Sequence, residues 1–156
     1  MLKKSLIALT LALSSFGCVH SNAPRKLTPE SMTAIRLDEA IRGKCNTISS
    51  VSPVFDFSSS ELSPDAKATL DTIATCFTSG HFKGANLRLI GFTDPRGTRS
   101  ANYELGLERA ESVAIFLEHN GMKRSQLIVT SRGEEGASPD RARWSADRIV
   151  DLSVAD

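Results

Sequence analysis

Segments with strand patterns alternate with segments with helix patterns over residues 51–154, and this order constrains the fold most. Ser63-Pro64-Asp65 is typical of a helix start, and the apolar residues that follow at helical spacing end near Gly80. A second helix is expected over about residues 101–120. Strands are expected over residues 51–57, 86–92, 127–131 and 149–154, with a short helical turn at 144–147. This alternation predicts the α/β class, with one sheet covered by helices.

The first 17 residues have the pattern of a secretion signal. A basic start with Lys3 and Lys4 precedes residues 5–17, a mostly apolar run without a charged side chain. The run is too short to span a bilayer, which takes about 20 apolar residues, and no later stretch of the sequence approaches that length. We therefore expect residues 1–17 to be a signal peptide that directs the protein out of the cytoplasm.

Gly17 directly precedes Cys18, and this resembles the lipobox of bacterial lipoproteins, in which the cysteine is lipidated and becomes the new N-terminus. The two residues before Gly17 depart from the usual pattern, and ordinary cleavage after Ala23 is the competing interpretation. We favour lipidation of Cys18. Val19, in place of aspartate, fits the sorting rule for outer-membrane lipoproteins, so we expect an outer-membrane protein that is lipid-anchored and faces the periplasm.

The sequence contains three cysteines, an odd number for an exported protein. Lipidation uses Cys18 and leaves Cys45 and Cys76 as a pair. In an oxidising compartment these two would close a disulfide, and two unpaired buried thiols are the alternative.

Residues 18–50 lack a sustained core pattern, and we interpret them as a tether before a domain over residues 51–156. Thr28 and Pro29 are suited to the first positions of a helix. A short helix from there to Gly43 would carry Ile35, Leu37 and Ile41.

The overall charge argues against nucleic acid as a partner. The chain has 19 basic and 18 acidic side chains, whereas nucleic-acid-binding proteins usually have a basic excess on one face. His20, His81 and His119 have no cysteine or acidic partners at ligand spacing, so no metal is expected. No serine or cysteine is paired with a histidine, which argues against nucleophilic catalysis. We expect neither catalytic activity nor a cofactor.

Two polar residues lie on the apolar side of the helix expected at 101–120. On a helical wheel, Asn102 and Arg109 lie within the arc of the apolar residues, and Gly106 on the same face leaves room for something to approach. A guanidinium in that position must be paired or ligand-bound, because an unpaired buried charge is very costly.

Asp94, in the turn before this helix, is the obvious partner of Arg109, and two interpretations compete. In one, the two residues form a fixed structural salt bridge. In the other, they stand on either side of a pocket for a small zwitterion, with its ammonium group on Asp94 and its carboxylate on the guanidinium fork of Arg109.

The sequence around these residues resembles the OmpA-like peptidoglycan-binding domain, and the resemblance covers about residues 51–154. The matching residues are Gly91-Phe92-Thr93-Asp94-Pro95-Arg96-Gly97-Thr98, Asn102, Leu105, Arg109-Ala110, Val113, Leu117 and Gly121, with Phe55-Asp56-Phe57 before them and Gly133-Glu134 and Asp147-Arg148 after them.

The resemblance implies a βαβαβ-type domain with one mixed sheet, which grips the diaminopimelate residue of the peptidoglycan stem peptide. It implies that Asp94 holds the amino group of this residue, that Arg109 holds its side-chain carboxylate and that Asn102 and Asp56 help to form the site. Near the C-terminus, Arg148 alone carries a positive charge where the family has two arginines, and it is either a ligand contact or a structural residue.

We therefore expect a protein that anchors the outer membrane to peptidoglycan without a covalent bond. The alternative is a docking component of an envelope or secretion assembly, with protein partners in the envelope and the wall as a secondary contact. An enzyme that acts on the wall would need an acid/base pair or a metal set, and neither is found in the sequence.

Overall fold

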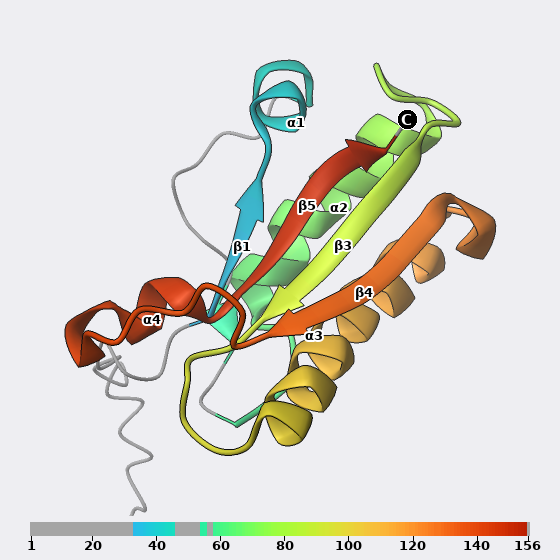
Figure 1. Cartoon of the computed structure of the whole chain (residues 1–156). Helices are drawn as coiled ribbons and strands as arrows, with labels where there is room; N and C mark the ends of the chain where they lie inside the picture. Colours follow the sequence, from blue (N-terminus) through green and yellow to red (C-terminus); the bar gives the residue numbers. More distant parts are fainter. Residues whose placement is uncertain (1–32, 46–53, 56–57, 156) are drawn as a thin grey trace, which may run out of the picture.

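The computed structural model describes residues 33–45, 54–55 and 58–155, with side chains described over 36–45 and 58–155 (Figure 1). The signal peptide, the lipobox with Cys18, Thr28, Pro29 and Asp56 lie outside the described residues.

One mixed five-stranded sheet forms the centre of the fold, with the strand order β2-β1-β5-β3-β4. The β1–β5 and β3–β4 pairs are parallel, whereas the β1–β2 and β3–β5 pairs are antiparallel. The strands are β1 (Thr33–Leu37), β2 (Val54–Phe55), β3 (Asn86–Phe92), β4 (Leu127–Gly133) and β5 (Ile149–Ala155). This sheet confirms the predicted α/β class; of the strand predicted at residues 51–57, the structure describes β2 alone.

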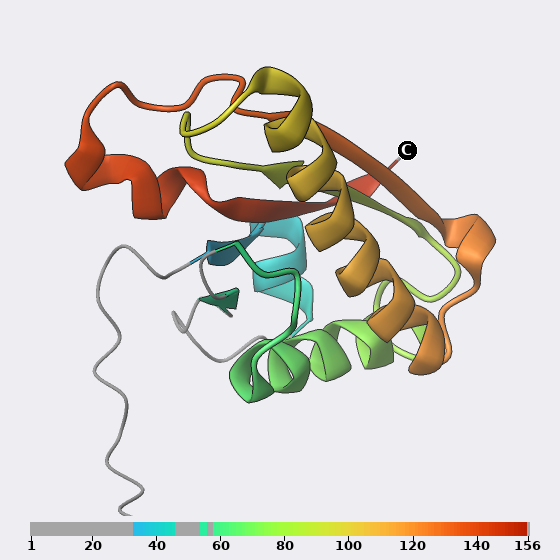
Figure 2. The same ribbon diagram turned by 90° about the horizontal axis from the view of Figure 1, so that it is seen from below.

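Two long helices cover one face of the sheet (Figure 2). They are α2 (Pro64–Thr78) and α3 (Arg99–His119), and both agree with the helices predicted from apolar spacing. The Ser63 hydroxyl accepts a hydrogen bond from the amide of Ala66, and Thr98 caps α3 in the same way. The shorter helices are α1 (Glu39–Lys44), η2 (Arg124–Gln126), η3 (Arg141–Arg143) and α4 (Trp144–Asp147).

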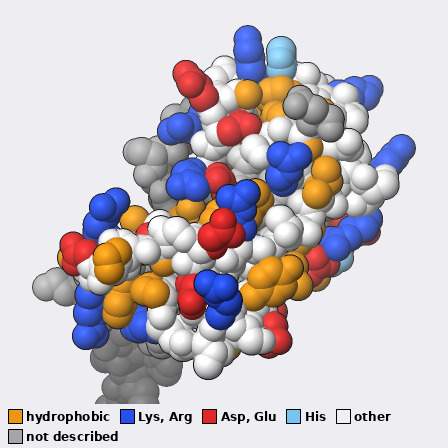
Figure 3. Space-filling model, viewed as in Figure 1, with side chains coloured by type: hydrophobic (Ala, Val, Ile, Leu, Met, Phe, Trp, Pro, Cys, Tyr) orange, Lys and Arg blue, Asp and Glu red, His pale blue; other side chains and the backbone are white. Residues whose placement is uncertain are grey.

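The hydrophobic core lies between the sheet and these two helices. Its fully buried side chains include Leu70, Ile73 and Phe77 from α2, Val113 and Leu117 from α3, and Leu87, Leu89, Val150 and Leu152 from the sheet. The opposite face carries charged and apolar side chains side by side (Figure 3). On that face Arg36 of β1 pairs with Asp151 of β5 at 2.8 Å.

The helix predicted from Thr28 to Gly43 is wrong over residues 33–37, which form β1. Ile35 and Leu37 fit a strand as well as a helix, and pairing with β5 decides between the two. Helix formation begins only after Asp38, whose carboxylate accepts hydrogen bonds from the amides of Ile41, at 2.7 Å, and Val154, at 3.0 Å. The folded domain therefore includes residues 33–45, which lie within the predicted tether.

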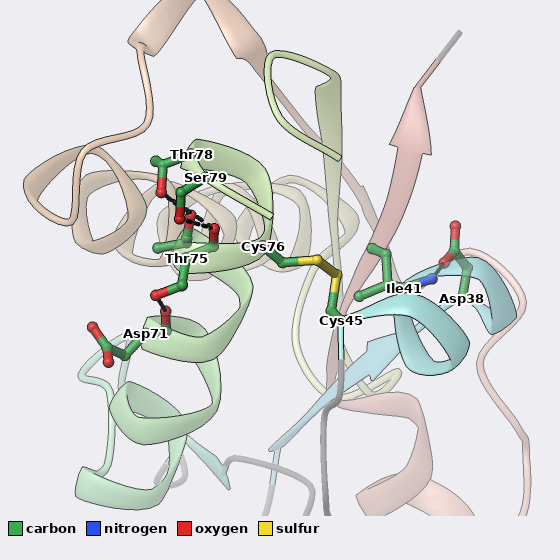
Figure 4. The surroundings of a disulfide bond; sticks show 9 residues. Asp38, Ile41, Cys45, Asp71, Thr75, Cys76, Thr78 and Ser79 are labelled. Carbon is green, nitrogen blue, oxygen red and sulfur yellow. Dashed lines mark hydrogen bonds between the residues drawn. A yellow bond between two sulfur atoms is a disulfide. The ribbon is translucent and has the colours of Figure 1, made fainter. Parts of the chain in front are cut away.

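A disulfide joins Cys45, at the end of α1, to Cys76 on α2 (Figure 4). Both cysteines are 5% exposed, and Ile41 on the same short helix is fully buried in the core. The predicted pairing is confirmed. On the chain-entropy model, closing a loop of this length stabilises a fold by about 3 to 4 kcal/mol, so the bond fastens the N-terminal segment to the domain.

Candidate functional site

The sheet topology brings three chain segments together at one end of the sheet. Because β3 and β5 run antiparallel, the end of β3 lies beside the start of β5, and Gly91 pairs with Val150. Asp94, just after β3, and Arg148, just before β5, therefore meet at this end of the sheet. β4 runs parallel to β3 and ends there too, which adds Glu134.

Helix α3 lies directly against β3 because two glycines face each other. A Cβ atom on Gly91 would stand 1.8 Å from the carbonyl oxygen of Gly106. A Cβ atom on Gly106 would stand 2.4 Å from the Ser131 hydroxyl. The space expected beside Gly106 is therefore filled by the sheet, and this close approach sets Asn102 and Arg109 above the strand ends.

A cavity of about 340 Å³ opens between the β3–α3 loop, α3 and the start of β5. Four of the five predicted site residues line it, namely Asp94, Asn102, Arg109 and Arg148. The fifth, Asp56, lies outside the described residues. The other lining residues are Ser58, Thr93, Arg96, Gly97, Ala101, Glu104, Leu105 and Glu108.

Asp94 is buried in this cavity and bonded to two arginines. Its Oδ1 accepts from the amide of Arg96 at 3.2 Å and from Nε of Arg96 at 3.0 Å. Its Oδ2 accepts from Nη2 of Arg96 at 2.9 Å and from Nη1 of Arg148 at 3.1 Å. Burial alone would raise the pKa of Asp94, but the hydrogen bonds and charge of the arginines outweigh it, so the pKa lies below its usual value. Asp94 is ionised at neutral pH.

The fixed salt bridge between Asp94 and Arg109, one of the two competing interpretations, is not formed. Among the described residues the partners of Asp94 are Arg96 and Arg148, and Nε of Arg109 donates to the carbonyl oxygen of Ser59 at 3.1 Å. Arg109 thus keeps its buried place by a contact from the segment before α2, and it faces the same cavity as Asp94.

The Arg109 side chain is 0% exposed, as its position on the apolar arc predicted. Burial and the charge of Arg148 lower its pKa to about 10, whereas the charges of Asp94 and Glu108 raise it. The guanidinium therefore stays protonated at neutral pH. It places a buried positive charge in the same cavity as the ionised Asp94.

Asn102 is also buried, and its side-chain amide donates a hydrogen bond to the carboxylate of Glu134, just after β4. The backbone reaches this contact through Gly133, which has a φ of +54° and lies against the backbone of Tyr103. A residue with a side chain would be strained and would clash there. Asn102 thus joins α3 to the β4 end of the site.

Sequence reasoning missed three residues at this site. The Thr93 hydroxyl is buried at the cavity and has no hydrogen-bond partner in the described part of the chain. Arg96 lies within the matched motif, and of its three bonds to Asp94 the one from its backbone amide belongs to a turn type that an aspartate two residues earlier favours. Trp144 on α4 stacks on Arg96, with 5.0 Å from the guanidinium carbon to the ring centroid. No local signal connects Trp144 to the site.

The described residues include no group of three or more His, Cys, Asp or Glu side chains arranged to hold a metal ion. None of the described helices is both long enough and apolar enough to cross a membrane. A buried anion, Asp94, and two buried cations, Arg109 and Arg148, line one cavity. This arrangement suits a small ligand with groups of both signs.

Comparisons with known proteins find a matching family model and several similar proteins. Residues 54–148 match the model of the OmpA family. The chain is similar to the peptidoglycan-associated lipoprotein of Pseudomonas aeruginosa, with 36% identity over 103 residues, which cover 63% of this chain and 58% of that protein. The peptidoglycan-associated lipoprotein of Mesorhizobium japonicum is 28% identical over 156 residues and is matched over 92% of its length.

Solved structures show the same fold. The peptidoglycan-associated lipoprotein from Burkholderia pseudomallei superposes with a TM-score of 0.61 and 31% sequence identity, over 66% of this chain and 88% of that one. The C-terminal domain of Helicobacter pylori MotB superposes with a TM-score of 0.58 at 22% identity, over 65% of this chain and 81% of that one, and shares the fold alone.

Proposed function

Because the chain belongs to the OmpA family, we propose that its domain binds peptidoglycan noncovalently through the diaminopimelate residue of the stem peptide. The observation that carries the proposal is the pair of opposite buried charges, Asp94 and Arg109, in one cavity. Three of the similar proteins are named as peptidoglycan-associated lipoproteins, and this supports the wall as the ligand.

The side chain of diaminopimelate ends in an ammonium group and a carboxylate on one carbon, so it offers both charges at short range. In the proposed complex Asp94 accepts hydrogen bonds from the ammonium group, and the Arg109 fork donates two to the carboxylate. A cavity of about 340 Å³ is large enough for such an end group.

Three further residues are proposed to shape the site. Asn102 positions the peptide from α3, and Asp56 contributes from the segment after β2. Arg148 holds the Asp94 carboxylate in place through its bond at 3.1 Å, so it acts on the ligand through Asp94.

The whole protein is proposed to anchor the outer membrane to the cell wall, from the periplasmic side. Lipidation of Cys18 supplies the membrane contact, and the domain supplies the wall contact. The chain spans about three fifths of the length of the Pseudomonas relative, so this role of the whole protein rests on the proposal. Binding by charge and shape requires no catalytic step.

Co-sedimentation with isolated sacculi tests the proposal. We expect the purified protein to sediment with sacculi whose stem peptides contain diaminopimelate and to stay in solution with sacculi that contain lysine. Soluble meso-diaminopimelate should release the bound protein, whereas the same concentration of lysine should not. Equal sedimentation with both wall types would contradict diaminopimelate recognition, and no sedimentation with either would contradict wall binding.

A further inference from the structure

The ammonium subsite in the proposed function is already occupied by the protein itself. A carboxylate has about four positions at which it accepts hydrogen bonds. On Asp94 the amide and Nε of Arg96 use two on Oδ1, and Nη2 of Arg96 and Nη1 of Arg148 use two on Oδ2. An ammonium group has three N–H donors to place, so at least one of these bonds must break before it can bind.

The two arginines differ in how easily they can leave. The Arg148 side chain is 2% exposed and directly precedes β5, so moving it would bury a guanidinium without its carboxylate. The Arg96 side chain is 32% exposed and belongs to the loop between β3 and α3. Water can solvate Arg96 when it moves, and its departure frees one acceptor position on each oxygen of Asp94.

Trp144 offers Arg96 a second contact. The guanidinium carbon of Arg96 lies 5.0 Å from the centroid of the Trp144 ring, within the range of a cation–π interaction. The indole is held in place, because its Nε1 donates to the carbonyl oxygen of Ser138 at 3.1 Å. Arg141 covers the ring as well, at 5.5 Å. Arg96 can therefore turn away from Asp94 along this ring without losing all of its contacts.

We propose that Arg96 is a gate on the ammonium subsite: its guanidinium caps Asp94 in the ligand-free protein and turns away along the Trp144 ring when an ammonium group binds. The proposal rests on the proposed function, because it concerns the same cavity and ligand. It makes Arg96 a residue that sets affinity by competing with the ligand.

The test is calorimetric titration with a synthetic stem peptide that ends in meso-diaminopimelate. Arg96→Met keeps the aliphatic part of the side chain and removes the two side-chain hydrogen bonds to Asp94 that compete with the ligand. This variant should therefore bind the peptide roughly two- to fivefold more tightly than wild type. Arg99→Met is the matched control, because it removes the same charge from an exposed position three residues away. The control should bind as wild type does, and thermal melting should show that both variants are folded.

A fluorescence titration gives a second readout, because Trp144 is the single tryptophan of the chain. Wild type and Arg99→Met should change their emission when the peptide binds, and Arg96→Met should bind without that change. Binding by Arg96→Met that is equal to or weaker than wild type, or wild-type binding without a change in emission, would overturn the gate. Failure of wild type to bind the peptide at all would overturn the proposed function and the gate together.

Discussion

At the scale of single residues, the site places opposite charges around one cavity, and two arginines hold the carboxylate of Asp94. Asp94 keeps its negative charge because Arg96 and Arg148 lower its pKa more than burial raises it. Arg109 keeps its positive charge although burial lowers its pKa to about 10. A ligand with both charges would find each partner ionised throughout the neutral pH range.

Ionised Asp94 should contribute to stability in a way that depends on pH. Its folded pKa lies below its unfolded value of about 4, so the contribution is complete above that value and is lost as pH falls through the folded pKa. We expect Asp94→Asn to be less stable than wild type at neutral pH, with a difference that shrinks below about pH 4. Urea unfolding of both proteins at a series of pH values measures this. A difference that stays constant from pH 6 to pH 3 would contradict it.

At the scale of secondary structure, the contact between α3 and β3 fixes the geometry of the site. Gly91 and Gly106 let the two backbones touch, and Arg109 lies almost one turn beyond Gly106 on the same helix. Any side chain at Gly91 would push α3 off the sheet and carry Arg109 with it.

Gly91→Ala should therefore destabilise the domain by about 3 kcal/mol or more, because the new methyl group meets a backbone carbonyl that cannot rotate away. Gly43→Ala is the control, since a Cβ atom there has no heavy atom within 4 Å. It lies inside α1, so it should change stability by less than about 1 kcal/mol, in the stabilising direction. Urea unfolding compares the two. Equal stability of both variants would show that the close approach of α3 and β3 is not required.

The sequence predicted the elements whose signals are local and missed those that depend on distant partners. Ser63, Pro64 and Asp65 indicated the start of α2, and the apolar arc of α3 singled out Arg109 as an exception. β1 was missed because its pairing with β5 joins segments more than 100 residues apart. The stacking of Trp144 on Arg96 was missed for the same reason, because the two residues meet only when α4 folds over the β3–α3 loop.

At the scale of the whole molecule, the proposal joins a lipid at one end of the chain to a wall-binding domain at the other. The disulfide between Cys45 and Cys76 fastens the N-terminal segment to the domain. Membrane attachment and wall binding should then be separable by mutation.

Cys18→Ser should move the protein from the membrane fraction to the soluble fraction, because stable anchoring requires the several acyl chains of a lipidated cysteine. Binding to purified sacculi should stay unchanged in this variant. A double variant, Cys45→Ser with Cys76→Ser, keeps the lipidation site and should remain with the membrane. If Cys18→Ser stays in the membrane fraction after the peptidoglycan has been digested, lipid anchoring is contradicted.

The most direct test of the account is the preference for diaminopimelate over lysine, measured by calorimetry with two stem peptides that differ in this residue alone. Lysine keeps the ammonium group and lacks the side-chain carboxylate, so wild type should bind the diaminopimelate peptide at least about tenfold more tightly. Arg109→Gln should lose most of that preference, Arg109→Lys should keep part of it, and the exposed control Arg88→Gln should keep all of it. Thermal melting identifies the folded variants. A folded Arg109→Gln protein with the full wild-type preference would show that Arg109 does not hold the ligand carboxylate.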